Sequence, residues 1–127
     1  MCGICGLALA DPSRRIDERA LSEMNEALRH RGPDEAGLWN GGHVGLGSRR
    51  LRIIDLFRGK QPMPNEDNTV CVVFNGEIYN YRALRDELES KGHKFNTLCD
   101  TEVVLRAYEA YGDECLQRFN GMFAFAV

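Results

Sequence analysis

Two cysteines near the amino terminus are the first residues that could carry chemistry. Cys2 and Cys5 stand three residues apart in "MCGICG". Such a pair could be accidental, supply two zinc ligands, form a redox dithiol, or contain one nucleophile that needs the chain terminus. A second close cysteine pair is missing and the three histidines are widely scattered, which argues against a metal site. A redox pair opens a helix after a strand, whereas this pair begins an apolar run typical of a strand.

The position of Cys2 favours a terminal nucleophile. Removal of Met1 would leave Cys2 as the first residue, so its own α-amino group could act as the base. The pKa of a free α-amino group lies just below that of an ordinary thiol, so the amine can accept the thiol proton near neutral pH. Gly3 leaves room around the sulfur. Cys5 is then a small core residue on the first strand.

Three further stretches could complete an acyl-transfer site for a small zwitterion. The side-chain amide of Asn75 and the N–H of Gly76 could form an oxyanion hole, although Asn-Gly is also a common turn pair. An arginine in "SRRLRIID" (48–55) could bind a carboxylate, or it could lie at a solvated strand edge. Asp100 could bind an amine, or it could simply cap a helix.

The elements that must position these residues are apolar strands and amphipathic helices. The pattern predicts strands at 3–10, on both sides of an "NGG" turn within 36–48, at 70–74 and from Met122 onward. It predicts helices after Asp17, after Asn80, after Asp100 and near 113–119, with a turn at 75–80. The first helix is expected to hold 29–31 in its last turn.

Several of these strands lack a polar face, so each sheet must be covered on both sides. Either a parallel sheet flanked by helices or two stacked sheets with helices outside would achieve this. The "NGG" hairpin favours antiparallel strands and therefore the second arrangement.

The composition is that of a soluble single domain. The chain has 127 residues, 43% hydrophobic and 28% charged, with a net charge of −3. It shows no dominant basic patch for nucleic acid, no apolar run of the roughly 18 residues that a membrane span needs, and no secretory signal. Five cysteines without a disulfide-like spacing indicate free thiols in a reducing compartment. The apolar end, "MFAFAV", leads us to expect a strand that continues into further chain.

Six blocks of sequence resemble a known family. "MCGICG", "RHRGPDE", "RRLRIIDL", "NGEIYNY", "CDTEVVL" and "NGMFAFAV" occur in the order and spacing of the class II glutamine amidotransferase domain. The likeness covers essentially the whole chain, and it is greatest to the amino-terminal glutaminase domain of the asparagine synthetase B family. The resemblance implies an α+β fold, the four-layer αββα sandwich of the N-terminal-nucleophile hydrolases, incomplete at its C-terminal end.

The resemblance also assigns roles to individual residues. Cys2 would be the nucleophile, and Asn75 with Gly76 the oxyanion hole. It implies that Arg50 binds the α-carboxylate of glutamine and that Asp100, assisted by Glu77, binds the α-ammonium group. The wall of the same pocket would come from Leu51, Ile53 and Ile54. "HRGPDE" (30–35) would be a loop that folds over the bound substrate. It implies no metal ligand.

The function implied is hydrolysis of the glutamine side-chain amide through a Cys2 thioester, in a cytoplasmic glutamine-dependent asparagine synthetase. Residues 1–127 would then be part of the amidotransferase domain and need no cofactor. A missing C-terminal synthetase domain would use ATP and Mg²⁺ to amidate aspartate. L-Glutamine and that domain are the expected partners, and a homodimer is allowed. Two alternatives stay open. The domain could supply ammonia to another acceptor, a sugar or a peptide, or it could be a non-catalytic module that only binds glutamine.

Overall fold

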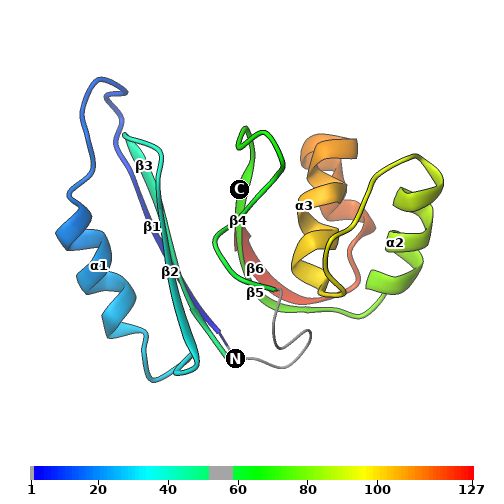
Figure 1. Cartoon of the computed structure of the whole chain (residues 1–127), viewed down its shortest axis with the longest axis horizontal. Helices are drawn as coiled ribbons and strands as arrows, with labels where there is room; N and C mark the ends of the chain where they lie inside the picture. Colours follow the sequence, from blue (N-terminus) through cyan, green and yellow to red (C-terminus); the bar gives the residue numbers. More distant parts are fainter. Residues whose placement is uncertain (1, 52–58) are drawn as a thin grey trace.

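Four layers make up the described part of the chain. The structure, a computed structural model, describes residues 2–51 and 59–127. Helix α1 (Glu18–Ala27) covers one three-stranded sheet, and a second three-stranded sheet faces the first. Helices α2 (Tyr81–Ser90) and α3 (Asp100–Tyr111) cover the far side of the second sheet (Figure 1). The predicted αββα sandwich is therefore confirmed, with antiparallel pairing throughout the described ladders.

The first sheet has the strand order β1-β3-β2. It is built from β1 (Gly3–Ala8), β2 (Glu35–Asn40) and β3 (Val44–Arg50), and the "NGG" turn joins β2 to β3 as predicted. Helix α1 begins after Asp17, whose carboxylate accepts hydrogen bonds from the N–H groups of Arg19 and Ala20. Leu21 of this helix is 1% exposed, so α1 is fastened to the sheet by its apolar face.

The second sheet has the order β4-β5-β6. Its members are β4 (Met63–Pro64), β5 (Cys71–Ile78) and β6 (Gly121–Ala126). Helix α2 (Tyr81–Ser90), helix α3 (Asp100–Tyr111) and the 3₁₀ helix η1 (Gly112–Arg118) follow the predicted ranges closely.

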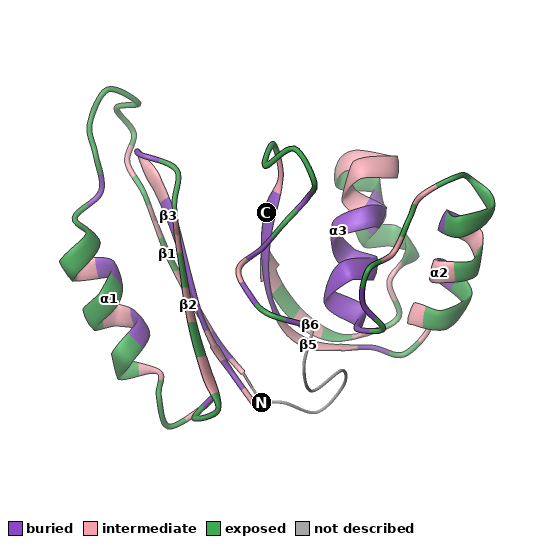
Figure 2. Ribbon diagram, in the orientation of Figure 1, coloured by how far each residue is buried: buried purple, intermediate pink, exposed green. Residues whose placement is uncertain are grey.

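Strand β5 faces apolar neighbours on both sides, as its unbroken apolar run predicts. One set of side chains, including Cys71 and Val73, packs between the two sheets against Leu46. The alternate set, including Val72 and Phe74, packs against α2 and α3 in the larger core. Buried residues concentrate on β3, on β5 and on the first half of α3 (Figure 2).

Three local expectations are wrong. The expected turn at 75–80 is mostly strand, because residues 75–78 continue β5 and pair with β6. Helix α1 ends at Ala27, so 29–31 lie in the turn that follows rather than in its last turn. Asp100 is the first residue of α3 and Cys99 precedes it as the N-cap, so Asp100 is not the cap.

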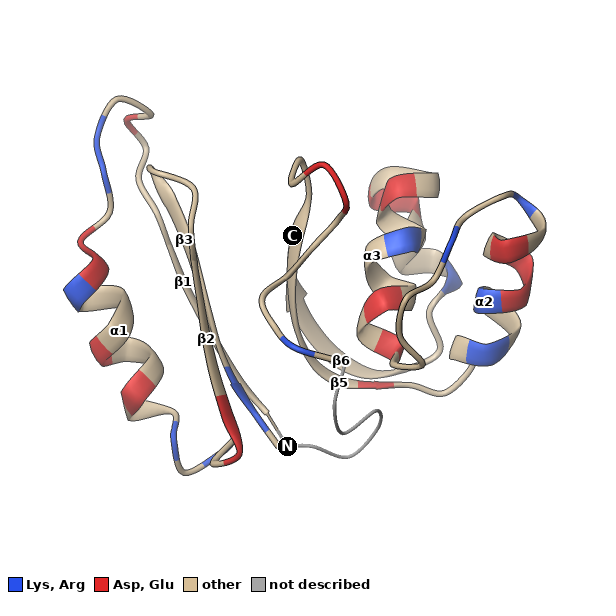
Figure 3. Cartoon of the chain, viewed as in Figure 1, with Lys and Arg blue, Asp and Glu red and all other residues tan. Residues whose placement is uncertain are grey.

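Each of the three α-helices carries charged residues of both signs (Figure 3). No helix in the described ranges is long and apolar enough to cross a membrane.

Candidate active site

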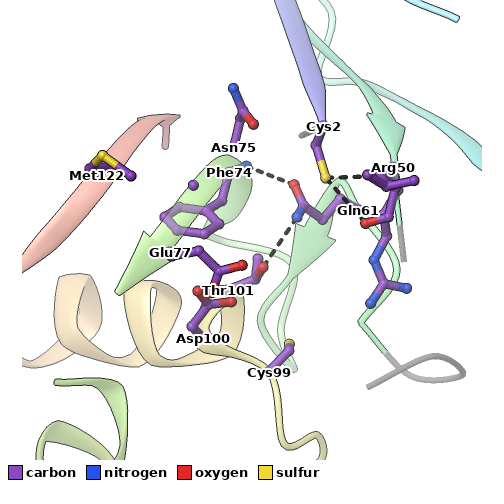
Figure 4. A pocket seen from close by; sticks show the side chains of 12 residues that line it. Cys2, Arg50, Gln61, Phe74, Asn75, Glu77, Cys99, Asp100, Thr101 and Met122 are labelled. Atoms are coloured by element: carbon purple, nitrogen blue, oxygen red, sulfur yellow. Dashed lines mark hydrogen bonds between the residues drawn. The ribbon is translucent and has the colours of Figure 1, made fainter. Parts of the chain in front are cut away.

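One pocket collects most of the residues to which the sequence assigns chemistry. It lies where the start of β1, the end of β3, the middle of β5 and the first turn of α3 approach one another (Figure 4). Its walls come from residues scattered over the whole chain: Cys2, Arg50, Leu51, Gln61, Phe74, Asn75, Gly76, Glu77, Cys99, Asp100, Thr101 and Met122.

Cys2 is held in this pocket by backbone groups of distant segments. Its Sγ accepts a hydrogen bond from the Leu51 N–H at 3.4 Å and donates to the Leu51 carbonyl at 3.7 Å. The Cys2 carbonyl accepts from Nε of Arg31 at 3.1 Å. The Cys2 sulfur is therefore held at the end of β3, and the Cys2 main chain is held at the turn after α1.

Cys5 lies in a different environment from Cys2. It pairs with Gly47 inside the first sheet, and burial raises the pKa of its thiol, so it stays protonated near neutral pH. All five cysteines, each in the described part of the chain, are unpaired. In that same part, no group of three or more His, Cys, Asp or Glu residues could hold a metal ion.

Asn75 and Gly76 stand on β5, beside β6. Gly76 has a φ of +155°, and a Cβ there would overlap the Met122 carbonyl and the Phe123 backbone, so only glycine fits. The Asn75 Oδ1 atom is buried and finds no hydrogen-bond partner among the described residues. A buried oxygen without a partner is costly if the side chain serves packing alone, which favours a role for Asn75 in ligand binding.

Arg50 supplies a cation to the pocket. It is the last residue of β3 and only 5% exposed, and its Nη1 donates to Oε2 of Glu35 on β2 at 3.3 Å. Leu51 follows it in the pocket wall. Ile53 and Ile54, which the resemblance places in the same wall, lie outside the described residues.

Two carboxyl groups lie side by side in the pocket (Figure 4). Burial raises the pKa of Asp100, against the opposing effect of hydrogen bonds from backbone N–H groups and of the positive charge on Arg50. Oδ2 of Asp100 accepts from the Ile78 N–H at 3.1 Å. Burial and the negative charge of Asp100 raise the pKa of Glu77. One cation and two acids in one pocket suit a ligand that carries both a carboxylate and an ammonium group.

The segment 30–35 is fastened to the first sheet near Cys2. Arg31 contacts the Cys2 carbonyl, and the Asp34 N–H donates to the Arg50 carbonyl at 3.1 Å. Among the described residues that line the pocket, none comes from this segment. Its closure over a substrate stays a prediction.

The chain matches the sequence profile of the glutamine amidotransferase domain over residues 1–127. It belongs to this family.

Similar proteins agree with this assignment. The chain is 47% identical over its whole length to asparagine synthetase [glutamine-hydrolyzing] 1 of Bacillus subtilis (strain 168), of which it covers 20%. It is 44% identical, again over its whole length, to asparagine synthetase [glutamine-hydrolyzing] 1 of Arabidopsis thaliana, of which it covers 21%. The chain thus spans about a fifth of the length of the curated relatives it matches.

A solved structure supports the fold independently. The glutamine phosphoribosylpyrophosphate amidotransferase from B. subtilis, complexed with ADP and GMP, superposes on the chain with a TM-score of 0.75. The two share 19% sequence identity, and the match covers 96% of this chain and 34% of that one. At this identity the likeness concerns the fold.

The sequence analysis gives no role to several pocket residues of this amidotransferase domain. Thr101 adjoins Asp100 and could have been noticed for that reason. Gln61 stands in a polar stretch without periodicity, and Phe74, Cys99 and Met122 look like ordinary apolar core positions. Only the fold brings them to the same place.

Proposed function

We propose that this chain is the glutamine-hydrolysing part of an asparagine synthetase, with Cys2 as its nucleophile. The observation that carries the proposal is the convergence of Cys2, the Asn75–Gly76 segment, Arg50 and the Asp100–Glu77 pair on one pocket. Whole-chain identity to glutamine-hydrolysing asparagine synthetases supports it.

In this proposal the charges of the pocket hold the two ends of the amino-acid part of glutamine. Arg50 binds the α-carboxylate, and Asp100 with Glu77 binds the α-ammonium group. Leu51 forms part of the wall, and we assign glutamine contacts to Ile53 and Ile54 from the family resemblance alone. Held in this way, the side-chain amide reaches Cys2, and the entropy of bringing the two groups together is lost on binding rather than in the chemical step.

The reaction begins once Met1 is removed. The free α-amine of Cys2 takes the thiol proton, and the sulfur attacks the amide carbon to give a tetrahedral oxyanion. The side-chain N–H of Asn75 and the backbone N–H of Gly76 stabilise that oxygen, each donor contributing roughly 3–4 kcal/mol. The C–N bond then breaks, the ammonium of Cys2 returns its proton to the departing nitrogen, and ammonia leaves. Water attacks the thioester and releases glutamate with the free thiol.

The fate of the ammonia completes the proposal. We place residues 1–127 within the amidotransferase domain of a cytoplasmic enzyme, with a C-terminal synthetase domain as partner and a homodimer as its assembly. ATP and Mg²⁺ would serve that domain, in which aspartate is the ammonia acceptor. The names of the relatives favour aspartate over a sugar or peptide acceptor and an enzyme over a non-catalytic binding module.

Intact-mass measurement tests the proposal directly. The full-length protein should lack Met1 and, after treatment with 6-diazo-5-oxo-norleucine, should carry a single adduct that peptide mapping places on Cys2. Glutamine added beforehand should slow the labelling. A retained Met1 blocks the α-amine and would refute the mechanism in favour of a binding module.

The affinity for glutamine should depend on pH through the Asp100–Glu77 pair. Binding needs the charged carboxylates, and the pKa of each is raised, so affinity should fall as pH decreases through a range above that of ordinary carboxyl groups. Calorimetric titration of the Cys2→Ala variant measures glutamine binding without turnover. The series should run from pH 7.5 down to about pH 4.5, which is close to the ordinary pKa of a glutamate side chain. Affinity that stays constant until ordinary carboxyl groups titrate would contradict the assignment.

A further inference from the structure

Gln61 joins three separate elements beside the pocket. Its side chain is buried, with 6% of the residue exposed. Oε1 accepts a hydrogen bond from the Phe74 N–H of β5 at 2.7 Å, and Nε2 donates to Oγ1 of Thr101 on α3 at 3.1 Å (Figure 4). Both partners are themselves nearly inaccessible, at 2% and 3% exposed, so with Gln61 in place they depend on its side chain rather than on solvent for these hydrogen bonds.

The chemistry of the partners fixes the orientation of this amide. A backbone N–H can only donate, so the oxygen of Gln61 must face Phe74 and its NH₂ group must face Thr101. An ionised carboxylate could accept from both groups but would place an unpaired charge at a buried position, and an apolar side chain would leave the Phe74 N–H without a partner. An uncharged side-chain amide satisfies both contacts.

Strand β5 is thereby tied to the start of α3 at two points. The first tie runs from Phe74 through Gln61 to Thr101. The second is the hydrogen bond from the Ile78 N–H to Oδ2 of Asp100. The residues between these points are 75–77, the segment to which the proposed function gives the oxyanion donors and one ammonium-binding carboxylate. Its position relative to α3 is therefore fixed at both ends.

The main chain of Gln61 is in turn fixed against the other sheet. A Cβ atom at Gly37 of β2 would overlap the Gln61 carbonyl oxygen, so the two backbones are in close contact. Strand β2 pairs with β3, and β3 pairs with β1, which begins directly after Cys2. A short path through Gln61 thus connects the sheet that holds the sulfur to the strand that holds Asn75 and Gly76.

We propose that Gln61 is a positioning residue that sets the oxyanion donors of β5 against the Cys2 sulfur and the first turn of α3. It acts through Phe74 and Thr101, and the inference rests on the proposed glutaminase function. A displacement of the donors by a fraction of an ångström weakens an interaction made in the transition state. Loss of Gln61 should therefore lower kcat more than it raises KM, since Asp100 keeps its own bond to Ile78.

The test compares Gln61→Met with the wild-type full-length protein. Methionine keeps the length of the side chain and removes both hydrogen bonds. We expect kcat for glutamate release to fall about 10- to 100-fold, per folded protein, with KM changed less than about threefold. The rate of Cys2 alkylation by iodoacetamide, which needs no oxyanion hole, should stay at the wild-type value.

Asn65→Leu is a matched control for the loss of a buried amide. Asn65 also links the β5 side of the fold to α3, since its Oδ1 accepts from the Val70 N–H at 3.0 Å and its Nδ2 donates to Glu109 at 2.8 Å. This link lies away from the pocket. The variant should lose stability as Gln61→Met does and keep the wild-type kcat.

A second pair of variants keeps the test decisive if Gln61→Met does not fold. Thr101→Val removes only the acceptor of Nε2 and should lower kcat, whereas Thr101→Ser restores the hydroxyl and should recover it. Wild-type kcat in Gln61→Met, or in Thr101→Val, overturns the inference, as does an equal loss in Asn65→Leu. A wild-type protein that releases no glutamate overturns the proposed function itself, and with it this inference.

Discussion

Cys2→Ala should abolish glutamate release while leaving the fold intact. Loss of a covalent nucleophile costs on the order of 10⁶-fold in kcat, because the remaining groups can only stabilise an attack by water. The Cys2 sulfur bonds only to backbone atoms of Leu51 within the described residues, so the free energy of unfolding should change by less than about 1 kcal/mol. Coupled glutamate detection and thermal melting measure the two effects. Cys2→Ser should be inactive as well.

Cys5→Ala is the control for this experiment. Cys5 lies on β1, three residues after Cys2, and its thiol is held protonated by burial. Its replacement should leave both glutamate release and the labelling of Cys2 by the diazo reagent at wild-type levels. If Cys2→Ala kept measurable turnover while Cys5→Ala lost it, the nucleophile would be misassigned and the two cysteines would have to be treated as a functional pair.

The sequence predicts the layers well because the layers depend on local patterns. An unbroken apolar run at 70–74 requires cover on both faces, and β5 receives it from the other sheet and from α3. The "NGG" turn fixes the β2–β3 hairpin, and Asp17 starts α1 through side-chain capping. Each of these signals depends on neighbours within a few residues, so tertiary contacts do not need to be known.

The end of β5 shows where local reasoning fails. Asn75-Gly76 has the composition of a turn, yet pairing with β6, more than forty residues later, keeps the chain extended through Ile78. The glycine is required for a different reason, because the β6 backbone approaches it too closely for a side chain. Asp100 is likewise of a residue type that favours helix N-caps, but its carboxylate accepts a hydrogen bond from the Ile78 N–H of a distant strand.

The candidate site was predicted through motifs, and Gln61 shows the limit of that approach. Cys2, Arg50, Asn75 and Asp100 stand in recognisable blocks, and the fold brings them to one pocket. Gln61 has no periodicity, charge or turn preference to mark it, and its importance arises from two hydrogen bonds to residues 13 and 40 positions away. Such a role depends on three-dimensional neighbours alone.

Asp100→Asn should weaken glutamine binding without weakening the fold. Asparagine can still accept the hydrogen bond from the Ile78 N–H, but it lacks the charge that would attract the α-ammonium group. The KM for glutamine should rise about 10- to 150-fold, the equivalent of one charge-assisted hydrogen bond of about 1.5–3 kcal/mol. Steady-state kinetics and a calorimetric titration in the Cys2→Ala background measure this loss.

The stability of the same variant should stay equal or increase at pH 7. Burial raises the pKa of Asp100 in the folded state, so folding favours its protonated form, and the ionised form opposes folding above that pKa. The neutral amide carries no such cost. For the wild type, this group's contribution to the free energy of unfolding should therefore improve as pH falls through the folded-state pKa, and the variant should lose that dependence.

Glu102→Gln, two residues later on α3, should show the opposite behaviour. Glu102 is 2% exposed, its carboxylate accepts from the N–H groups of Asn96 and Thr97, and it pairs with Arg106. Removing this charge should lower the free energy of unfolding by about 1–3 kcal/mol and leave KM unchanged, because Glu102 does not line the pocket. Of these two acidic residues in one helical turn, Asp100 would then serve glutamine binding and Glu102 would serve the stability of the fold. If Asp100→Asn instead lost stability and kept its KM, Asp100 would serve the docking of α3 on β5, and the ammonium group would have to bind elsewhere.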